Sequence, residues 1–593
     1  MEESVLLLTM MSMMLTAGIC SVLFNKLKMP AIIGYLLAGI LLVNIFDLNH
    51  SADFSMETVE VLKDIGLVML MFGIGMELNI DKIKKYGKFA ALVAVIQLPL
   101  MVLSGYAFGM ILFGLDATGA ITLGAVISGS STAVVAAVLK THDRITKEQA
   151  DTLVLVTIME DIGQVLILSM VTPLFLGSQV EATDLIKLII LIIVFMAVSL
   201  YVGIKFIPRI LDWIGDNTSA EVLLVMSVGL CFIMAWLSVR IGMSMAIGAF
   251  LMGVIVSQSK FCEHISEKTE PMKELFMAVF FISVGMEVTF QGFIDSLPMA
   301  IGILLVFMLS KFITVFLGYF IGNKPFEECF VCSVSLMAMG EFAFIISSEA
   351  FKNGAVSEGF YTAVIGAALM SMILLPILAK KMYAVSDWLS TKRPQPLKFF
   401  AEGAFHIRDD IHARAENSPR MRDFLNSQLK KTYFCILLII IIEIVFSGFM
   451  NQMNDFLTQL ITVDFMDSHY LAYLILMTVN LILLSIPTLS LIKSIKKIDE
   501  MMLEGERIII VRHSERNERD VKRFYQRLMN FSTFALVLTI DFIIMAVAPG
   551  PFGAEKSSLV VIPLAIAIFA IAYILSSKGS KNNPMLIMDE EEQ

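Results

Sequence analysis

Long apolar runs alternate with short polar segments along the chain. Runs of membrane-crossing length begin near residues 4, 31, 59, 88, 118, 150, 185, 221, 243, 271, 296, 327 and 360, and four more begin near 432, 470, 531 and 557. About 20 apolar residues in a helix cross the roughly 30 Å hydrocarbon layer of a bilayer. The pattern therefore predicts an all-α polytopic membrane protein with thirteen spans by about residue 383 and four additional C-terminal spans.

Charged segments interrupt the later part of this pattern. Residues 384–431 carry mixed charge, which is typical of a solvated cytoplasmic linker. A second charged segment, 493–528, lies between the additional spans and is also expected on the cytoplasmic side. We therefore divide the chain into a membrane domain (1–383), a linker (384–431) and a four-helix membrane region (432–593) with a cytoplasmic tail. That last region is expected to regulate, to enlarge a dimer interface or to bind a partner.

Basic residues gather in alternate loops and so predict the orientation of the chain. The basic loops lie around residues 26–28, 82–88, 140–147, 205–209, 260–273, 324 and 380–381. Loops rich in Lys and Arg stay in the cytoplasm, so the amino terminus is expected outside the plasma membrane and the carboxyl terminus inside. The exceptions, near the ends of spans, are Lys63, Lys187, Arg240, Lys352 and Lys556.

Composition narrows the possible functions. The 593 residues are 57% hydrophobic and only 17% charged, with mean hydropathy +0.81, which excludes an ordinary soluble protein. The formal net charge of −10 argues against nucleic acid as a partner. The 6 cysteines are scattered and predict no disulfide framework. The region after the membrane domain contains no glycine-rich phosphate loop following a strand, so regulation by a nucleotide-binding domain is not expected there. We expect no cofactor.

Two neighbouring carboxylates, Glu160 and Asp161, lie near the middle of the sixth apolar run (153–171). Charge is costly at that depth, and such residues usually serve a function. Helical spacing places Thr157, Asp161 and Gln164 on one stripe, about 100° away from Glu160. An oxygen-rich stripe suits a small cation. The alternative is that either acid belongs to a structural ion pair with another buried residue.

Small and polar residues interrupt two other apolar runs. The segment SGSST (128–132) breaks the fifth run, and MGE (339–341) breaks the twelfth. Broken helices at the midplane present carbonyls, hydroxyls and helix ends to an ion. Because the two breaks lie seven spans apart, the segments are expected to run in opposite directions, as in an inverted repeat. The alternative is that the small residues only allow close helix packing.

The eleventh apolar run contains a lysine, Lys311, with about ten residues of apolar chain on each side. The side chain either extends to a membrane surface or neutralises a buried carboxylate. The deep carboxylates available are Glu160, Asp161 and Glu341. Because of its apolar surroundings, we expect Lys311 to compensate charge at the ion site.

Seven motifs in order along residues 1–383 point to a family. They are GYLLAGILL (34–42), LMFGIGMEL (70–78), SSTAVV (130–135), EDI (160–162), AIGAFLMG (246–253), FFISVGM (280–286) and GEFAF (340–344). Together they resemble the monovalent cation:proton antiporter-2 family, which includes Kef-type potassium efflux systems and sodium/proton antiporters. We find no family resemblance for residues 384–593.

This resemblance implies a thirteen-helix sodium/proton-antiporter-type fold with inverted repeats, usually a homodimer. The ion site is expected where the broken fifth and twelfth helices cross beside the sixth. Carried over by position, Asp161 resembles the aspartate that binds the monovalent cation and the proton, and Lys311 resembles the lysine that pairs with the preceding acid. Glu160 stands where electrogenic relatives have aspartate, electroneutral ones often asparagine, and Kef-type proteins glutamine. The stoichiometry of exchange is therefore open.

The resulting hypothesis is a secondary antiporter that exchanges Na⁺ or K⁺ for H⁺. The cation would bind to Asp161 and to further oxygen ligands from Ser130, Ser131 and Thr132. Alternatives are a gated Kef-like K⁺ efflux pathway and a membrane sensor built on the same fold. An intramembrane aspartyl protease is disfavoured because its two aspartates must lie on separate helices. We therefore do not expect an enzyme.

Overall fold

The computed structural model describes residues 2–26, 29–44, 56–78, 80–139, 144–175 and 182–392, with isolated positions between 405 and 497. Within these residues the regular structure is helical, apart from one isolated backbone bridge, so the predicted all-α class is confirmed there. The chain divides into two compact units, Met1–Phe405 and His406–Gln593. The four predicted C-terminal helices fall in the second unit, where they are described at isolated positions or lie outside the described residues.

Sixteen helices follow one another in the described part of the first unit. They are α1 (Glu2–Lys26), α2 (Ala31–Asn44), α3 (Met56–Glu77), α4 (Ile80–Leu112), α5 (Ala117–Val126), α6 (Thr132–Leu139), α7 (Lys147–Phe175), α8 (Ala182–Asn217), α9 (Ala220–Arg240), α10 (Met245–Val256), α11 (Cys262–Met286), α12 (Phe290–Ile321), α13 (Phe326–Ser335), α14 (Glu341–Lys352), α15 (Glu358–Ala379) and α16 (Met382–Lys392).

Length and apolar composition single out helices that are able to cross a membrane. Among the described residues, seven helices meet both conditions: α1, α4, α7, α8, α9, α12 and α15. Helices α2 and α10 are apolar but shorter, and α5 with α6, like α13 with α14, forms a pair of short helices in succession. The count of thirteen spans therefore stays a prediction.

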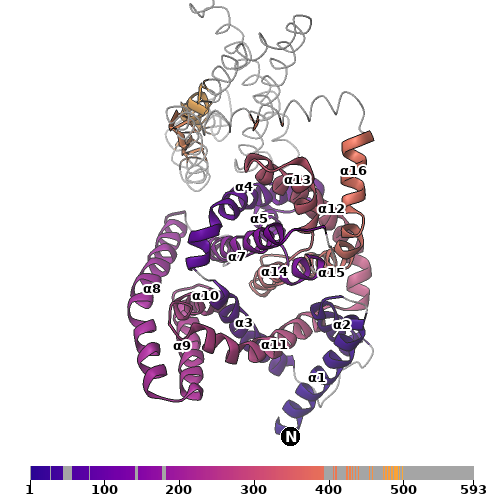
Figure 1. Ribbon diagram of the computed structural model, residues 1–593, viewed down its shortest axis with the longest axis vertical. Coiled ribbons are helices and arrows are strands. Elements are labelled where there is room, and N and C mark those ends of the chain that lie inside the picture. The colour runs from indigo at the N-terminus through magenta and orange to yellow at the C-terminus, as the bar shows by residue number, and fades with distance from the viewer. Residues whose placement is uncertain are drawn as a thin grey trace, which may run out of the picture. The chain divides into compact units, whose positions relative to one another are not determined.

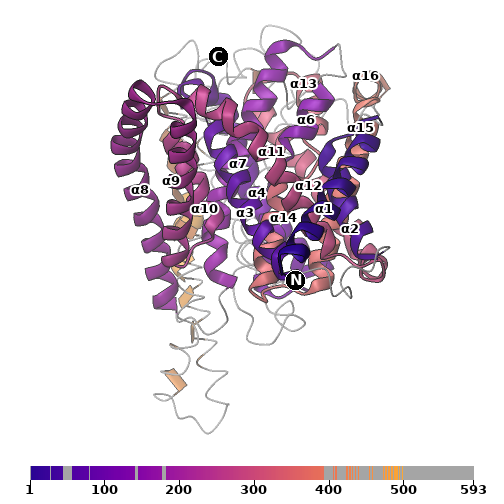
Figure 2. The ribbon, with the colours of Figure 1, turned by 90° about the horizontal axis from the view of Figure 1, so that it is seen from below.

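The helices of the first unit pack as two bundles (Figure 1). The first bundle consists of α1, α2, α3, α8, α9, α10 and α11, and occupies the lower part of Figure 1. The second bundle, above it, consists of α4 to α7 and α12 to α16. Helices α8 and α9 stand side by side at one edge of the first bundle in both views (Figure 1 and Figure 2). The three segments of the predicted ion site, α5 with α6, α7, and α13 with α14, all belong to the second bundle.

Glycines allow some helices of the first bundle to touch through their backbones. A Cβ atom added to Gly75 of α3 would lie 2.3 Å from the carbonyl oxygen of Phe250 in α10. One added to Gly39 of α2 would lie 2.1 Å from the carbonyl oxygen of Ile282 in α11. Any larger residue at either position would force these helices apart. Small residues at contacts between membrane helices normally allow the backbones to approach this closely.

Both predicted helix breaks are present, with slightly different limits. The first runs over residues 127–131 and the second over 336–340. Thr132 and Glu341, which the sequence placed within the breaks, are instead the first residues of α6 and α14. A carboxylate in the first turn of a helix is favoured by the helix dipole, which accounts for the position of Glu341.

Candidate ion-binding site

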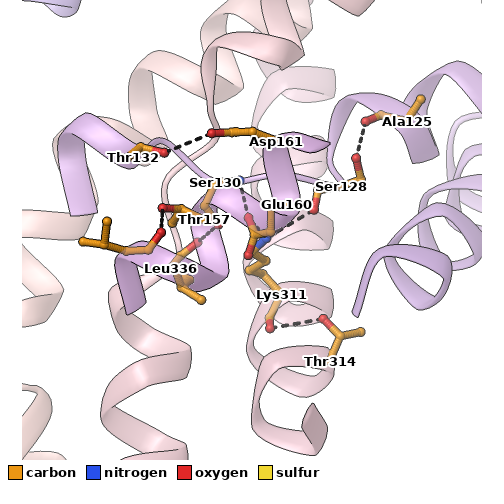
Figure 3. A network of polar contacts seen from close by, with 11 residues as sticks. Ala125, Ser128, Ser130, Thr132, Thr157, Glu160, Asp161, Lys311, Thr314 and Leu336 are labelled. Atoms are coloured by element: carbon orange, nitrogen blue, oxygen red, sulfur yellow. Dashed lines mark hydrogen bonds and ion pairs between the residues drawn. The ribbon is translucent and has the colours of Figure 1, made fainter. Parts of the chain in front are cut away.

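The two helix breaks meet backbone to backbone. Ser130 and Met339 form an isolated antiparallel bridge, and the amide of Ser131 donates a hydrogen bond to the carbonyl of Ala338 (2.9 Å). The hydroxyl of Ser130 also donates to the carbonyl of Leu336 (2.9 Å; Figure 3). These bonds satisfy backbone groups that the ends of four half-helices leave without helical partners.

Two glycines make room for this crossing. A Cβ atom on Gly340 would lie 2.7 Å from the carbonyl oxygen of Ser130, which is itself held in the crossing. A Cβ atom on Gly129 would lie 1.8 Å from Oε1 of Gln164, so the carboxamide of Gln164 occupies the space directly beside the first break. Glycine at these two positions therefore brings α7 and the second break close to the first break.

Glu160 and Lys311 form a fully buried ion pair beside the first break. Oε2 of Glu160 lies 3.0 Å from Nζ of Lys311 and accepts a hydrogen bond from the amide of Ser130 at 2.8 Å (Figure 3). Nζ of Lys311 also donates to the carbonyl of Ser128 at 3.2 Å. Both charged side chains are 0% exposed. The pair joins α7 and α12 to the break, so Lys311 contacts Glu160 rather than a membrane surface.

Asp161 has a different environment from its neighbour. Its carboxylate points away from the Lys311 pair, toward the start of α6 (Figure 3). Oδ2 accepts a long hydrogen bond, 3.4 Å, from the hydroxyl of Thr132, and Oδ1 has no hydrogen-bond partner among the described residues. The residue is 6% exposed. Asp161 is therefore a nearly buried carboxylate with oxygen lone pairs available to a ligand.

Further carboxylates surround Asp161. Glu341, at the start of α14, and Glu77, at the end of α3, both interact with it electrostatically, as does Glu160. Glu77 is in turn bound by Lys273 of α11, whose Nζ lies 2.6 Å from its Oε1. Among the described residues, Lys311 forms its ion pair with Glu160 and none with Glu341. The site thus combines one compensated acid, Glu160, with acids whose negative charge favours a cation at Asp161.

The remaining residues of the predicted site differ in whether their polar side-chain atoms have hydrogen-bond partners. The Thr157 hydroxyl donates to the carbonyl of Val154 within its own helix (2.9 Å). The Ser131 hydroxyl accepts from the amide of Val134 at the start of α6 (3.5 Å). Gln164 is 1% exposed, and neither amide atom has a hydrogen-bond partner among the described residues. On this stripe, Gln164 and Asp161 therefore each have a side-chain oxygen atom without any hydrogen bond among the described residues, whereas the Thr157 hydroxyl already donates one.

Sequence reasoning missed several charged or polar residues that the structure buries or pairs. Glu77 was visible only as part of a family motif, and Lys273 as one of the basic residues of a loop. Gln97 is a single amide in an apolar run and is 0% exposed in the structure. A lone amide in a membrane span gives no pattern, so only the neighbouring helices reveal it.

Two crossing helix breaks beside buried carboxylates define the architecture of a secondary ion transporter, whose binding sites form from discontinuous helices. Comparison with known families agrees. Residues 11–382 match the family of transmembrane sodium/hydrogen exchangers, and the chain belongs to that family.

Named relatives are cation antiporters. The chain is 23% identical over 365 residues to the Na(+)/H(+)-K(+) antiporter GerN of Bacillus cereus, a match that covers 61% of this chain and 92% of GerN. It is 28% identical to K(+) efflux antiporter 5 of Arabidopsis thaliana, covering 68% and 71% of the two chains. It is also 28% identical to an Na(+)/H(+) antiporter of Enterococcus hirae, covering 61% and 94%.

A solved structure shares the fold. The sodium proton antiporter MjNhaP1 of Methanocaldococcus jannaschii superposes with a TM-score of 0.52 at 19% identity, covering 63% of this chain and 96% of that one. The family, the apolar helices and this likeness establish a multi-pass membrane protein with an antiporter-type fold. The relatives are transporters rather than enzymes.

Proposed function

We propose that the protein is a secondary antiporter that exchanges Na⁺ or K⁺ for H⁺ at Asp161. The observation that carries this proposal is the nearly buried Asp161 carboxylate, which has one long hydrogen bond and one oxygen without a partner among the described residues. Its position beside the start of α6 leaves it open to either a proton or a cation. The names of the relatives support both Na⁺ and K⁺ as substrates.

A single carboxylate suffices for exchange because a cation and a proton compete for the same oxygens. Na⁺ and K⁺ prefer oxygen ligands, which Asp161, the Thr132 hydroxyl and the carbonyls of Ser130 and Ser131 supply. Protonation of Asp161 removes the charge that holds the cation. Binding of the cation in turn prevents protonation of Asp161. Release of either ion from Asp161 therefore allows the other ion to bind.

Movement of the second bundle against the first would expose this site to either side of the membrane in turn. Asp161 and both helix breaks belong to the second bundle and so move together, whereas Glu77 and Lys273 belong to the first bundle. An empty, negatively charged site crosses an apolar barrier at high cost, whereas a site loaded with a proton or cation crosses more easily. Exchange is then obligatory. In this proposal the protein works as a homodimer in the plasma membrane, with its amino terminus outside.

Glu160 decides how many charges move in each cycle. If Glu160 keeps its ion pair with Lys311 throughout, Asp161 alone exchanges one cation for one proton. If the pair opens, Glu160 takes up a second proton and the exchange becomes electrogenic. The geometry supports both routes, because Oε1 of Glu160 has no hydrogen-bond partner among the described residues.

The test uses purified protein in liposomes that contain a pH-sensitive dye, with Na⁺, K⁺ or Li⁺ added outside. We expect proton movement that depends on the cation in the wild type and is lost in Asp161→Asn. Asp151→Asn is the matched control, since Asp151 is an exposed acid on the same helix. Exchange that persists in Asp161→Asn would contradict the proposal. Flux of K⁺ without proton movement would instead support a gated efflux pathway.

A further inference from the structure

Three helices of the second bundle, α4, α7 and α12, contribute valines to one apolar cluster. Val93 of α4, Val156 of α7 and Val315 of α12 belong to one buried cluster. Helix α12 runs opposite to α4, because Gly318 and Gly322 of α12 lie against Val93 and Phe89 respectively. One helical turn forward along α4 therefore corresponds to one turn backward along α12.

Helix α7 runs in the same direction as α4. Val156 shares the cluster with Val93, and further along both helices Gly163 lies against Leu98. The contact of Gly318 with Val93 places Gln97 level with about residue 314 of α12, one turn from Lys311. The contact of Gly163 with Leu98 places Gln97 about two residues beyond the level of Glu160 on α7. Gln97 therefore lies within about one helical turn of Glu160 and Lys311 in depth, on helices that share one apolar cluster.

Gln97 carries hydrogen-bonding atoms that the structure leaves unused. It is 0% exposed, and neither its Nε2 nor its Oε1 has a hydrogen-bond partner among the described residues. Oε1 of Glu160, within one helical turn in depth, is also without one. A buried amide without partners is costly compared with an apolar side chain of the same shape. An amide in this position therefore calls for a role beyond packing.

We infer that Gln97 is a positioning residue of the transport site, whose carboxamide binds the second oxygen of Glu160 when the pair with Lys311 loosens during the cycle. The inference rests on the proposed exchange function. An amide suits this task because Nε2–H donates to a carboxylate, whereas Oε1 accepts from a protonated carboxyl group. Gln97 thus serves either protonation state of Glu160, and donation to the charged state is the stronger bond.

The test compares four proteins: wild type, Gln97→Met, Glu160→Gln and the double variant. Methionine has a similar shape without the amide. We expect Gln97→Met to fold at least as stably as the wild type, since it removes an unsatisfied buried group. Its pH profile of cation-driven proton movement should shift to more alkaline pH by about half to one unit, the effect of losing one hydrogen bond to the carboxylate. The same substitution should cause no shift in the Glu160→Gln background.

Each outcome decides the inference. An unchanged pH profile in an active Gln97→Met would overturn it, as would an equal shift in both backgrounds, because Gln97 would then act independently of Glu160. A clear fall in the unfolding temperature of Gln97→Met would assign the amide a purely structural role. Gln97→Glu gives a second test, since a carboxylate there should compete with Glu160 for Lys311 and slow exchange. Absence of exchange in the wild type would contradict the proposed function. In that case the unfolding temperature of Gln97→Met would still test whether the amide has a purely structural role.

Discussion

Ser130 and Met339 face each other in an antiparallel backbone bridge, although they are far apart in the sequence. The bridge is the point at which the two helix breaks cross, and Ser130 there also donates its amide proton to Glu160. Because the crossing and the buried ion pair share Ser130, a change in one of them is expected to disturb the other.

Gly340 is the residue of this crossing that tolerates substitution least. In Gly340→Ala the new methyl group would collide with the backbone carbonyl of Ser130, which cannot move without breaking the bridge. We expect a loss of about 1–3 kcal/mol in stability together with most of the transport activity. Gly359→Ala is the matched control, because a Cβ atom there is no nearer than 3.7 Å to a neighbouring atom. Thermal unfolding of both variants checks the prediction, and equal midpoints would contradict it.

The Glu160–Lys311 pair is expected to be costly to break from one side. Lys311→Met leaves an uncompensated buried carboxylate and should lower stability by about 3–5 kcal/mol. The double variant with Glu160→Gln should recover most of that loss, since no buried charge is left unpaired. A double variant as unstable as Lys311→Met alone would argue against this electrostatic explanation. Transport by a stable double variant would further indicate that Asp161 alone carries the exchange.

Tyr361 connects the two bundles at a point away from the ion site. Its hydroxyl, on α15 of the second bundle, donates to Oε2 of Glu287, the residue that follows α11 in the first bundle. Tyr361→Phe should lower stability by about 1–2 kcal/mol, the usual loss for a hydrogen bond to a charged group that keeps some solvent. Tyr201→Phe, at a position 73% exposed, is the control. If the two variants unfold at the same temperature, the contact does not hold the bundles together.

The sequence predicted the helix breaks well, but not all of their limits. Gly129 and the neighbouring serines marked the first break, whereas the second begins at Leu336, three residues before the predicted start at Met339. Leu336, Met337 and Ala338 are apolar and suit a helix, so no local pattern shows that they leave it. The crossing itself, through Ser131 and the carbonyl of Ala338, supplies the hydrogen bonds that a continued helix would otherwise provide.

Pairing between distant residues was predictable only in part. Lys311 had three candidate partners in the sequence. The packing of the helices brings Glu160 into contact with it, and this packing cannot be derived from sequence spacing. Lys63 and Lys352, two exceptions to the pattern of basic loops, each pair with an acid from another segment of the chain. Lys63 pairs with Glu287 at 2.6 Å, and Lys352 lies 3.1 Å from Glu60. Such pairs neutralise the charge that the orientation rule counts, and sequence spacing does not reveal them.

Competition between a cation and a proton for Asp161 is the central claim. Its most direct test is the apparent KM for the transported cation, measured in liposomes over a range of pH. As pH falls, the proton occupies a larger fraction of Asp161, so KM should rise by up to about tenfold per pH unit, while the maximal rate at saturating cation stays nearly constant. Asp151→Asn should behave as the wild type does. A KM that is independent of pH, with a maximal rate that falls in acid, would show that the two ions do not share Asp161 and would contradict the account.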